Sequence, residues 1–357
     1  MSSIFLLVSL LIPFLGLANG QTTPTTPTTP KSPTTPTSPK TPVTPSADGG
    51  CCPHGKLAVK GTQLVGADGT PVQLRGMSLF WSNFPEGAPF YNEQTVKCLK
   101  CNWDANIVRA AMGVENDKGY LQNPDAEYAK MEAVVDAAMK NCMYVLVDWH
   151  YTSATAYPEK AADFFDKISK KCAGKCNCLY ETWNEPTSVD WSSTLKPYHE
   201  KIINTIRKND KDGVVIAGTP NWDQQVDKAA ADPIKDQTNV MYTVHFYSGE
   251  AAHNDPLRKT TEDAIKAGLP IFVTEYGTTP ASGDGTPNFD EANKWYKLMD
   301  DNKISYINWS ISNKGEQSSA LKPGATAADV CKDDQDTSSG AFVKKMLKAK
   351  NGAQKGC

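Results

Sequence analysis

Short apolar segments recur along the chain from about residue 57 onward, and more polar stretches separate them. Runs of this length without an alternation of polar positions are typical of parallel strands that are buried on both faces. Each run is therefore a candidate strand. The eight runs are Val72–Ser78, Asn106–Met112, Tyr144–Trp149, Leu179–Trp183, Val214–Gly218, Met241–Phe246, Ile271–Thr274 and Tyr306–Ile311.

Amphipathic stretches occupy most of the intervals between these runs. In Asp125–Lys140, for example, the apolar residues fall at helical spacing and form one face. Eight strand–helix units over about 295 residues predict an α/β protein with a single (β/α)₈ TIM barrel. An open, doubly wound sheet is the alternative, but no glycine-rich phosphate-binding motif follows the first strand. The other expected helices lie near Ala161–Lys171, Thr194–Lys208, Pro256–Ala267, Asp290–Asp301 and Phe342–Lys350.

The amino-terminal end has the pattern of an export signal. Ile4–Leu17 is almost wholly apolar, and small residues follow at Ala18 and Gly20. This pattern predicts a signal peptide over residues 1–20 and a protein secreted to the extracellular space. The apolar stretch is short for a membrane span, so a membrane anchor is the weaker alternative.

Residues 21–50 are rich in threonine and proline. Proline recurs at every third position from Pro24 to Pro45, which matches the three-residue turn of polyproline II. The segment has no residues that could form a core, and we expect a disordered linker or tail. The globular domain is accordingly expected over residues 51–357.

Charge and cysteine content narrow the class of protein. Lys and Arg total 37 against 40 Asp and Glu, a net charge of −3. This balance gives no electrostatic reason to expect a nucleic-acid partner and favours a neutral substrate. Ten cysteines in a chain with an export signal predict up to five disulfides, whose pairing the sequence leaves open. A metal site at Cys172, Cys176 and Cys178 is the weaker alternative, because their spacing is not that of zinc sites.

Polar residues follow the predicted strands at the points where these end. The carboxyl ends of barrel strands meet at one face, so side chains there are candidates for chemistry. Each alone has an ordinary structural explanation, such as a buried ion pair or a hydrogen-bonded core histidine. A whole set at the same end of successive strands is much less expected by chance. The set comprises Arg109, His150, Asn184, Glu185, His245, Tyr247, Glu275 and Trp309.

Two glutamates of this set form a candidate catalytic pair. Glu185 follows the fourth strand and Glu275 the seventh, and a barrel brings these two strand ends across from one another. Cleavage of a glycosidic bond needs one carboxylic acid to protonate the leaving oxygen and a second carboxylate to attack the anomeric carbon. In a shared dry cleft, repulsion between the two raises one pKa. Exposed loop glutamates are the common alternative, but the surroundings LYETWNEP and IFVTEYG are apolar.

In these motifs the chain resembles glycoside hydrolase family 5, in the branch of bacterial and invertebrate endo-β-1,4-glucanases. The resemblance covers nearly all of residues 57–321 in the order found in the family. The motif Asn-Glu-Pro alone is weak, whereas the ordered set is very specific. The matching stretches are LRGMSLFW (74–81), NIVRAAM (106–112), VLVDWH (145–150), LYETWNEP (179–186), IAGTPNW (216–222), NVMYTVHFYSG (239–249), IFVTEYGTTPASGDG (271–285) and INWSISNKGEQSSAL (307–321).

The resemblance implies a retaining endo-β-1,4-glucanase that needs no metal or organic cofactor. Glu185 is implied as the acid/base and Glu275 as the nucleophile, with Asn184 holding the 2-hydroxyl of the cleaved sugar. Arg109 and Tyr247 are implied to orient the Glu275 carboxylate. The implied partner is a β-1,4-glucan or a cello-oligosaccharide bound by a monomer, with no nucleic-acid or membrane partner.

Further contacts with the sugar chain are implied around this pair. Trp309 is the implied stacking floor, with a cis peptide after it, and His150 and His245 line the same site. Flat aromatic rings suit the C–H faces of glucose, while polar groups bind its rim. The remaining implied substrate contacts are Trp81, Lys314 and Glu316 one sugar further out, Trp222 on the leaving-group side, and Ala281 and Ser282.

The chain departs from related bacterial enzymes at three places. Leu79-Phe80 stands where those enzymes have a histidine, Gly113 where they have a tyrosine, and Tyr276 where they have a tryptophan. None of the three removes a catalytic group, but all bear on sugar preference. An endo-xylanase or mannanase of the same family is therefore the nearest alternative. A non-catalytic carbohydrate-binding barrel is the alternative from another class, although such a protein is expected to have lost one of the two glutamates.

Overall fold

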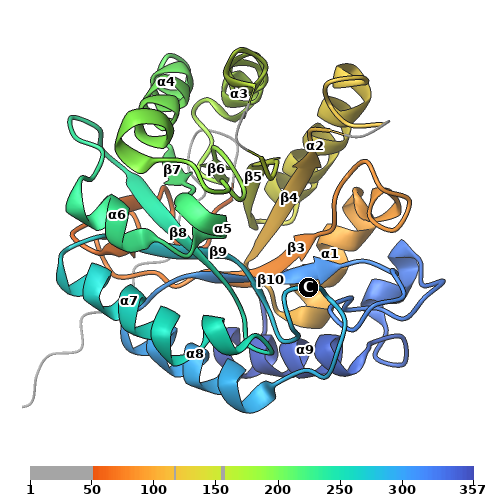
Figure 1. Ribbon diagram of the computed structural model, residues 1–357. Helices are drawn as coiled ribbons and strands as arrows, with labels where there is room; N and C mark the ends of the chain where they lie inside the picture. Colours follow the sequence, from red (N-terminus) through yellow and green to blue (C-terminus); the bar gives the residue numbers. More distant parts are fainter. Residues whose placement is uncertain (1–50, 116–117, 154–156) are drawn as a thin grey trace, which may run out of the picture. The chain divides into compact units, whose positions relative to one another are not determined.

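The computed structural model describes residues 51–115, 118–153 and 157–357, and within them eight parallel strands form a closed barrel (Figure 1). The strands follow one another around the barrel in chain order. The last, β10 (Tyr306–Ile311), pairs with both β9 (Ile271–Gly277) and the first barrel strand, β3 (Arg75–Leu79). This closure confirms the predicted (β/α)₈ barrel and excludes an open, doubly wound sheet.

Helices alternate with the strands and surround the barrel (Figure 1). The strands are β1 (Ala58–Lys60), β2 (Gln63–Val65), β3, β4 (Ile107–Gly113), β5 (Tyr144–His150), β6 (Cys178–Glu181), β7 (Val214–Ala217), β8 (Val240–Tyr247), β9 and β10. The helices are α1 (Glu93–Trp103), α2 (Pro124–Lys140), α3 (Pro158–Cys172), α4 (Lys196–Arg207), α5 (Pro220–Asp223), α6 (Val226–Ala231), α7 (Asp255–Lys266), α8 (Phe289–Asp301) and α9 (Ser338–Asn351). Short 3₁₀ helices cover Ala88–Phe90, Ala251–His253 and Ala327–Cys331, and a π-helical turn covers Trp191–Leu195.

The hairpin β1–β2, which the hydrophobic pattern does not predict, packs on the amino-terminal end of the barrel. Leu57 and Leu64 of this segment are buried in one apolar cluster with Leu146, Leu179 and Phe272 of the barrel strands. Strands of three residues are too short to produce a recognisable alternation. Because apolar side chains fill this end, the opposite end, where the strands finish, remains for a functional site.

The first barrel strand begins later than predicted, at Arg75 rather than Val72. Val72 is buried, as its apolar run indicates, but its N–H donates to the Leu64 carbonyl at 2.8 Å and joins it to the hairpin. Burial and strand membership are therefore separate properties of this run.

Helices α1, α5 and α6 also lie outside the predicted set. In α1 the buried Val96, Leu99 and Trp103 occupy one face, but lysines and cysteines between them obscure the pattern. The helix begins where the Asn92 side chain accepts the N–H of Thr95 at 3.0 Å, a favourable N-cap.

The predicted disulfides are confirmed, and all ten cysteines are paired. Two bridges fasten the start of the described chain to the barrel, and one fastens the last residue to α1. Cross-links between distant positions stabilise a fold largely by restricting the unfolded chain. The pairs are Cys51–Cys142, Cys52–Cys176, Cys98–Cys331, Cys101–Cys357 and Cys172–Cys178.

The predicted signal peptide and Thr/Pro-rich tail, residues 1–50, lie outside the described residues. Among the helices of the described ranges, none combines the length and the apolar character needed to cross a membrane.

Candidate active site

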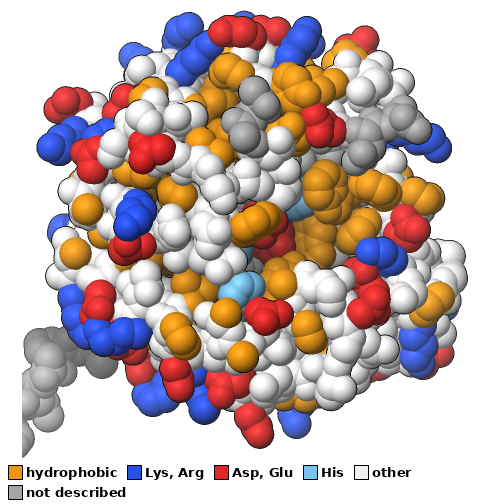
Figure 2. Space-filling view, viewed as in Figure 1, with side chains coloured by type: hydrophobic (Ala, Val, Ile, Leu, Met, Phe, Trp, Pro, Cys, Tyr) orange, Lys and Arg blue, Asp and Glu red, His pale blue; other side chains and the backbone are white. Residues whose placement is uncertain are grey.

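A cleft of about 200 Å³ opens at the carboxyl ends of the barrel strands. Figure 2 shows this face hollowed near its centre, with acidic and apolar side chains around the hollow. Most of the predicted site residues line it, together with three that were not predicted. The predicted lining residues are Trp81, His150, Asn184, Glu185, Tyr247, Glu275, Ala281, Ser282, Trp309, Lys314 and Glu316, and the others are Phe80, Gly283 and Ser318.

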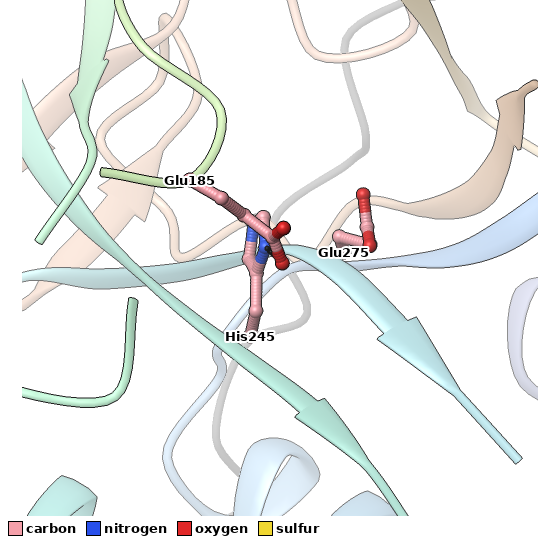
Figure 3. A group of neighbouring side chains, drawn as sticks. All are labelled: Glu185, His245 and Glu275. Atoms are coloured by element: carbon pink, nitrogen blue, oxygen red, sulfur yellow. Dashed lines mark hydrogen bonds and ion pairs between the residues drawn. The ribbon is translucent and has the colours of Figure 1, made fainter. Parts of the chain in front are cut away.

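The two predicted catalytic glutamates face one another in this cleft (Figure 3). Glu275 lies within β9 and is 4% exposed, whereas Glu185 follows β6 and its side chain is 19% exposed. One carboxylate oxygen from each, and one ring nitrogen of His245, lie within 4.8 Å of one another. Two acidic groups are therefore held close together, one more accessible than the other.

Arg109 of β4 lies beneath the cleft, fully buried, and binds one oxygen of Glu275. Its Nη1 donates to Glu275 Oε2 at 2.8 Å, and its Nε donates to Glu181 Oε2 at 2.7 Å. Its Nη2 is 2.9 Å from Asp148 Oδ2 and donates to Asn184 Oδ1 at 2.5 Å. Burial alone lowers the pKa of Arg109, but the three carboxylates raise it well above its ordinary value. A rigid guanidinium fork suits this task better than a lysine.

Tyr247, the last residue of β8, binds the other oxygen of Glu275. Its hydroxyl donates to Glu275 Oε1 at 2.7 Å. Burial raises the pKa of Glu275 and the nearby Glu185 raises it further, while His245, Arg109 and the Tyr247 hydrogen bond oppose this. The carboxylate is thus held by one donor on each oxygen, which fixes its orientation.

His245 of β8 links the two sides of the cleft. Its Nδ1 is 3.1 Å from Glu185 Oε1 and 3.3 Å from Asp223 Oδ2, and its Nε2 is 2.9 Å from the Thr274 hydroxyl. Burial lowers its pKa, but the nearby carboxylates of Asp223, Glu181 and Glu185 raise the pKa well above the ordinary value. The carboxylates around the ring therefore favour its protonated form.

His150, at the end of β5, has the opposite character. Burial first, and then the positive charges of Arg109 and His245, lower the pKa of His150 well below its ordinary value. Its Nδ1 is 2.6 Å from Asp148 Oδ2. The neutral ring stacks on Trp309 at 5.0 Å between centroids with an interplanar angle of 4°. The two parallel rings form one wall of the cleft, on which a sugar ring can pack.

The outer predicted contacts lie around this wall. Trp81 meets the edge of His150 at 4.2 Å, and Lys314 pairs with Glu316 while its ammonium lies 5.5 Å above the Phe80 ring. Phe80 thus takes a place in the cleft at the position where the sequence departs from related enzymes. The peptide after Trp309 is cis, as the resemblance implies.

The other two departures lie away from the cleft wall. Tyr276 is buried in the outer core, where it stacks on Phe246 at 5.2 Å and its hydroxyl is 3.0 Å from that of Tyr296. Gly113 is closely approached by Asn83, whose Oδ1 would lie 1.8 Å from an added Cβ. A larger residue at position 113 would displace Asn83.

Comparison with known proteins identifies the family. Residues 65–315 match the family model described as Cellulase (glycosyl hydrolase family 5). The chain belongs to glycosyl hydrolase family 5. It is similar to endoglucanase Z of Dickeya dadantii, with 44% identity over 268 residues, 75% of this chain and 62% of that protein. An endoglucanase of Clostridium saccharobutylicum is 40% identical over 304 residues, 83% of this chain and 66% of that protein. The chain thus spans slightly less than two thirds of the length of these relatives.

Solved structures agree with this family 5 assignment. A structure from Cytophaga hutchinsonii superposes with a TM-score of 0.81 at 45% identity, covering 84% of this chain and 96% of that one. The catalytic domain of an endoglucanase from Thermobifida fusca, in complex with cellotetraose, superposes with a TM-score of 0.74 at 32% identity, covering 83% and 98%.

This family 5 barrel also holds buried polar residues that the sequence reasoning missed, namely Asp148, Glu181, Asp223 and Thr274. Asp148 and Glu181 stand inside apolar strands, where a charge is costly unless it is paired. That signal could have identified them as paired buried charges, although it does not show which residue pairs with them. Asp223 has no such signal, because its position depends on a turn that the hydrophobic pattern does not specify.

Trp222 completes the predicted set. Trp222 does not line the 200 Å³ cleft but projects beside it, 41% exposed. Its backbone N–H donates to the Pro186 carbonyl at 2.8 Å, so the ring lies on the side of the cleft that carries Glu185. Among the described residues it is the one large apolar side chain that is exposed.

Proposed function

We propose that this protein is an endo-β-1,4-glucanase that hydrolyses internal bonds of the glucan with retention of anomeric configuration. The approach of Glu185 to Glu275, with oxygens within 4.8 Å, carries the mechanistic part of the proposal. Carboxyl groups about 5–5.5 Å apart are typical of retaining glycosidases, whereas inverting enzymes leave about 6.5–9.5 Å for a water molecule. The names of the family 5 relatives as endoglucanases support the substrate.

In the proposed mechanism Glu275 attacks the anomeric carbon and forms a glycosyl ester, while Glu185 gives its proton to the leaving oxygen. Arg109 and Tyr247 keep the attacking carboxylate in position. Glu185, now ionised, then removes a proton from water, which hydrolyses the ester. The accessible position of Glu185 and the buried position of Glu275 suit these two roles. No metal or organic cofactor enters the proposal, because two carboxyl groups suffice for this chemistry.

The same proposal assigns the sugar contacts. Trp309 and His150 provide the wall for the cleaved sugar, and Asn184 holds its 2-hydroxyl. The proposed outer contacts are Trp81, Lys314 and Glu316 one sugar further out, Ala281 and Ser282 on the loop after β9, and Trp222 on the leaving-group side.

We further propose that residues 1–20 are a signal peptide, that 21–50 are a tail, and that 51–357 are the catalytic domain of a secreted monomer. The five disulfides support this location, because disulfides persist in oxidising compartments outside the cytosol.

The substrate is tested by comparing the hydrolysis of carboxymethylcellulose, xylan and glucomannan. We expect carboxymethylcellulose to be hydrolysed fastest of the three. Its viscosity should fall steeply while few reducing ends have been produced, as internal cleavage requires. Proton NMR of the first products should show the β-anomer before mutarotation. Faster cleavage of xylan or glucomannan would make the substrate assignment wrong but leave the mechanism, and binding without cleavage would favour a non-catalytic barrel.

The pKa shift of Glu275 predicts the acid side of the pH profile. A nucleophilic carboxylate must be ionised, and the pKa of this one is raised. Activity should therefore be lost, as the pH falls, at a midpoint above the ordinary glutamate pKa of about 4.3. The measurement is kcat/KM against pH on an uncharged soluble cello-oligosaccharide, and an acid midpoint below that value would contradict the prediction.

A further inference from the structure

Asp223 lies at the end of an unusual turn that follows β7. The backbone of Asn221, Trp222 and Asp223 is left-handed at all three positions, with φ of 57°, 54° and 61°. In this conformation the Cβ of an L-residue crowds the following carbonyl oxygen, and apart from glycine only asparagine and aspartate adopt it at times, so the cost falls mainly on Trp222. Such backbone persists where the surrounding structure holds it, and it concentrates at functional sites.

Two hydrogen bonds fasten this turn to the segment that follows Glu185. The N–H of Trp222 donates to the Pro186 carbonyl at 2.8 Å, and the N–H of Asn221 donates to the Thr187 carbonyl at 3.0 Å. The turn, which includes α5 (Figure 1), therefore keeps a fixed relation to Glu185. One consequence of its shape is that Trp222 is exposed while the next residue is fully buried.

The buried carboxylate of Asp223 has one oxygen that serves the fold and one that faces His245. Its Oδ1 accepts the backbone N–H of Thr219 at 2.5 Å. Its Oδ2 has no hydrogen-bond partner among the described residues and lies 3.3 Å from Nδ1 of His245. The same nitrogen is 3.1 Å from Glu185 Oε1. Burial raises the pKa of Asp223 well above its ordinary value, and the charge of His245 is the main influence that opposes this rise. The charge of Asp223 therefore depends on the imidazolium beside it, as the imidazolium depends on Asp223, and two carboxylates lie near one ring nitrogen.

We propose that Asp223 is a positioning residue that acts through His245: its negative charge keeps the imidazole protonated, and its Oδ2 draws the Nδ1 proton partly away from Glu185. Glu185 is then left with its own proton for the leaving oxygen. This inference deepens the proposed function and rests on it only for the role of Glu185. The contact between Asp223 and His245 stands by itself.

Several charged groups surround His245, and Asp223 is the one that offsets its burial most. Burial lowers the pKa of His245, and Asp223 is the largest of the influences that raise it. Glu181 adds to the rise from β6 at 3.7 Å, and Glu185 from the loop that follows. The other titratable or charged groups that face this region are Arg109 on β4, Asp148 and His150 on β5, Glu275 on β9 and His253 on the short helix after β8.

Removing the charge of Asp223 should act in one direction. The His245 imidazolium loses its strongest support, so it gives up its proton at a lower pH. The protonated form of His245, which the proposal requires, is therefore depleted sooner as the pH rises. The alkaline side of the pH profile should therefore move to lower pH.

The test is Asp223→Asn, which keeps the shape and the Oδ1 acceptor for Thr219 but removes the charge. We expect the alkaline midpoint of kcat/KM to fall by about one pH unit, the lower end of the shifts that a charge within 4–6 Å causes. The KM and the melting temperature should change little. Asp223→Ser, which also lacks the charge but leaves space, should show the same direction of shift.

The matched control is Asp210→Asn. Asp210 is also a buried aspartate, 3% exposed, and it accepts the hydroxyl of Tyr180 at 3.0 Å, away from His245. Its replacement should leave the pH profile unchanged. If Asp223→Asn lowers activity equally at every pH, or moves the alkaline midpoint upward, the proposal is wrong and Asp223 serves the fold alone.

A second readout separates this proposal from the proposed function. The protonation of His245 can be followed by NMR of its ring nitrogens in the full chain, with no substrate present. We expect the midpoint for His245 to fall in Asp223→Asn and to stay in place in Asp210→Asn. An unchanged midpoint would overturn the inference even in an active glucanase, and a lowered midpoint in a chain without glycanase activity would reject the proposed function instead.

Discussion

Replacing Glu275 by glutamine should lower kcat on soluble β-1,4-glucan by at least about four orders of magnitude, which corresponds to about 5.5 kcal/mol of transition-state stabilisation at 1.36 kcal/mol per tenfold. The amide has the shape of the carboxylate but cannot form the glycosyl ester. It also cannot accept from both donors, because its NH₂ group must face either Arg109 or the Tyr247 hydroxyl. The proposed covalent step and its electrostatic support are thus lost together.

The measurement is initial-rate kinetics on a cello-oligosaccharide, with a binding titration on the same substrate. Binding should persist within about tenfold, because the wall formed by His150 and Trp309 does not change. The matched control is Glu262→Gln on the outer helix α7, where the glutamate side chain is 43% exposed and pairs with Lys266; its activity should equal that of the wild type. More than about one per cent of wild-type kcat in Glu275→Gln would show that another group attacks the sugar.

The fold was largely predictable because a barrel strand that is buried on both faces appears in the sequence as an uninterrupted apolar run. The closing pair is less apparent, since Tyr306 of β10 lies beside Arg75 of β3 only because the whole ring closes. The hairpin β1–β2 could not be predicted from alternation, because its strands have three residues each. Helix α1 was obscured by the lysines and cysteines between its buried positions.

The site residues that stand at the ends of barrel strands were predictable from the sequence. His150, His245 and Glu275 come at strand ends, and a barrel gathers strand ends whatever their separation in sequence. The second layer beneath them was not predicted. Glu181 was absent from the predicted set because sequence alone does not show which buried charges share a partner. Asp223 depends on three successive left-handed residues, and neither hydrophobic pattern nor spacing specifies such a turn.

Arg109→Met should lower the free energy of unfolding at neutral pH by about 3–5 kcal/mol and abolish most activity. The fully buried guanidinium is the shared partner of Asp148, Glu181 and Glu275. Removing one member of a buried charge network leaves the others without compensation, which is strongly destabilising. Activity falls because the Glu275 carboxylate loses the donor to its Oε2.

The pH dependence distinguishes this cause from a simple packing defect. Burial raises the pKa of Glu181, but Arg109 and His245 together hold it below its ordinary value. A depressed folded-state pKa contributes stability that is present above the unfolded pKa and is lost as the pH falls through the folded value. The wild type therefore has a stabilising contribution at neutral pH that Arg109→Met lacks. Urea unfolding should show the largest difference between the two near pH 7, and the difference should shrink as the pH falls below the ordinary glutamate pKa of about 4.3.

Arg75→Met is the matched control for this experiment. Arg75 pairs with Asp300 at 3.0 Å at the other end of the barrel, with a side chain that is 12% exposed. We expect a smaller loss of stability and unchanged kcat, because a single carboxylate near the surface can be rehydrated when its partner is removed. If Arg109→Met and Arg75→Met cost the same, or if the cost at Arg109 does not vary with pH, then Arg109 acts through packing. In that case other groups balance the negative charges of the three carboxylates around it.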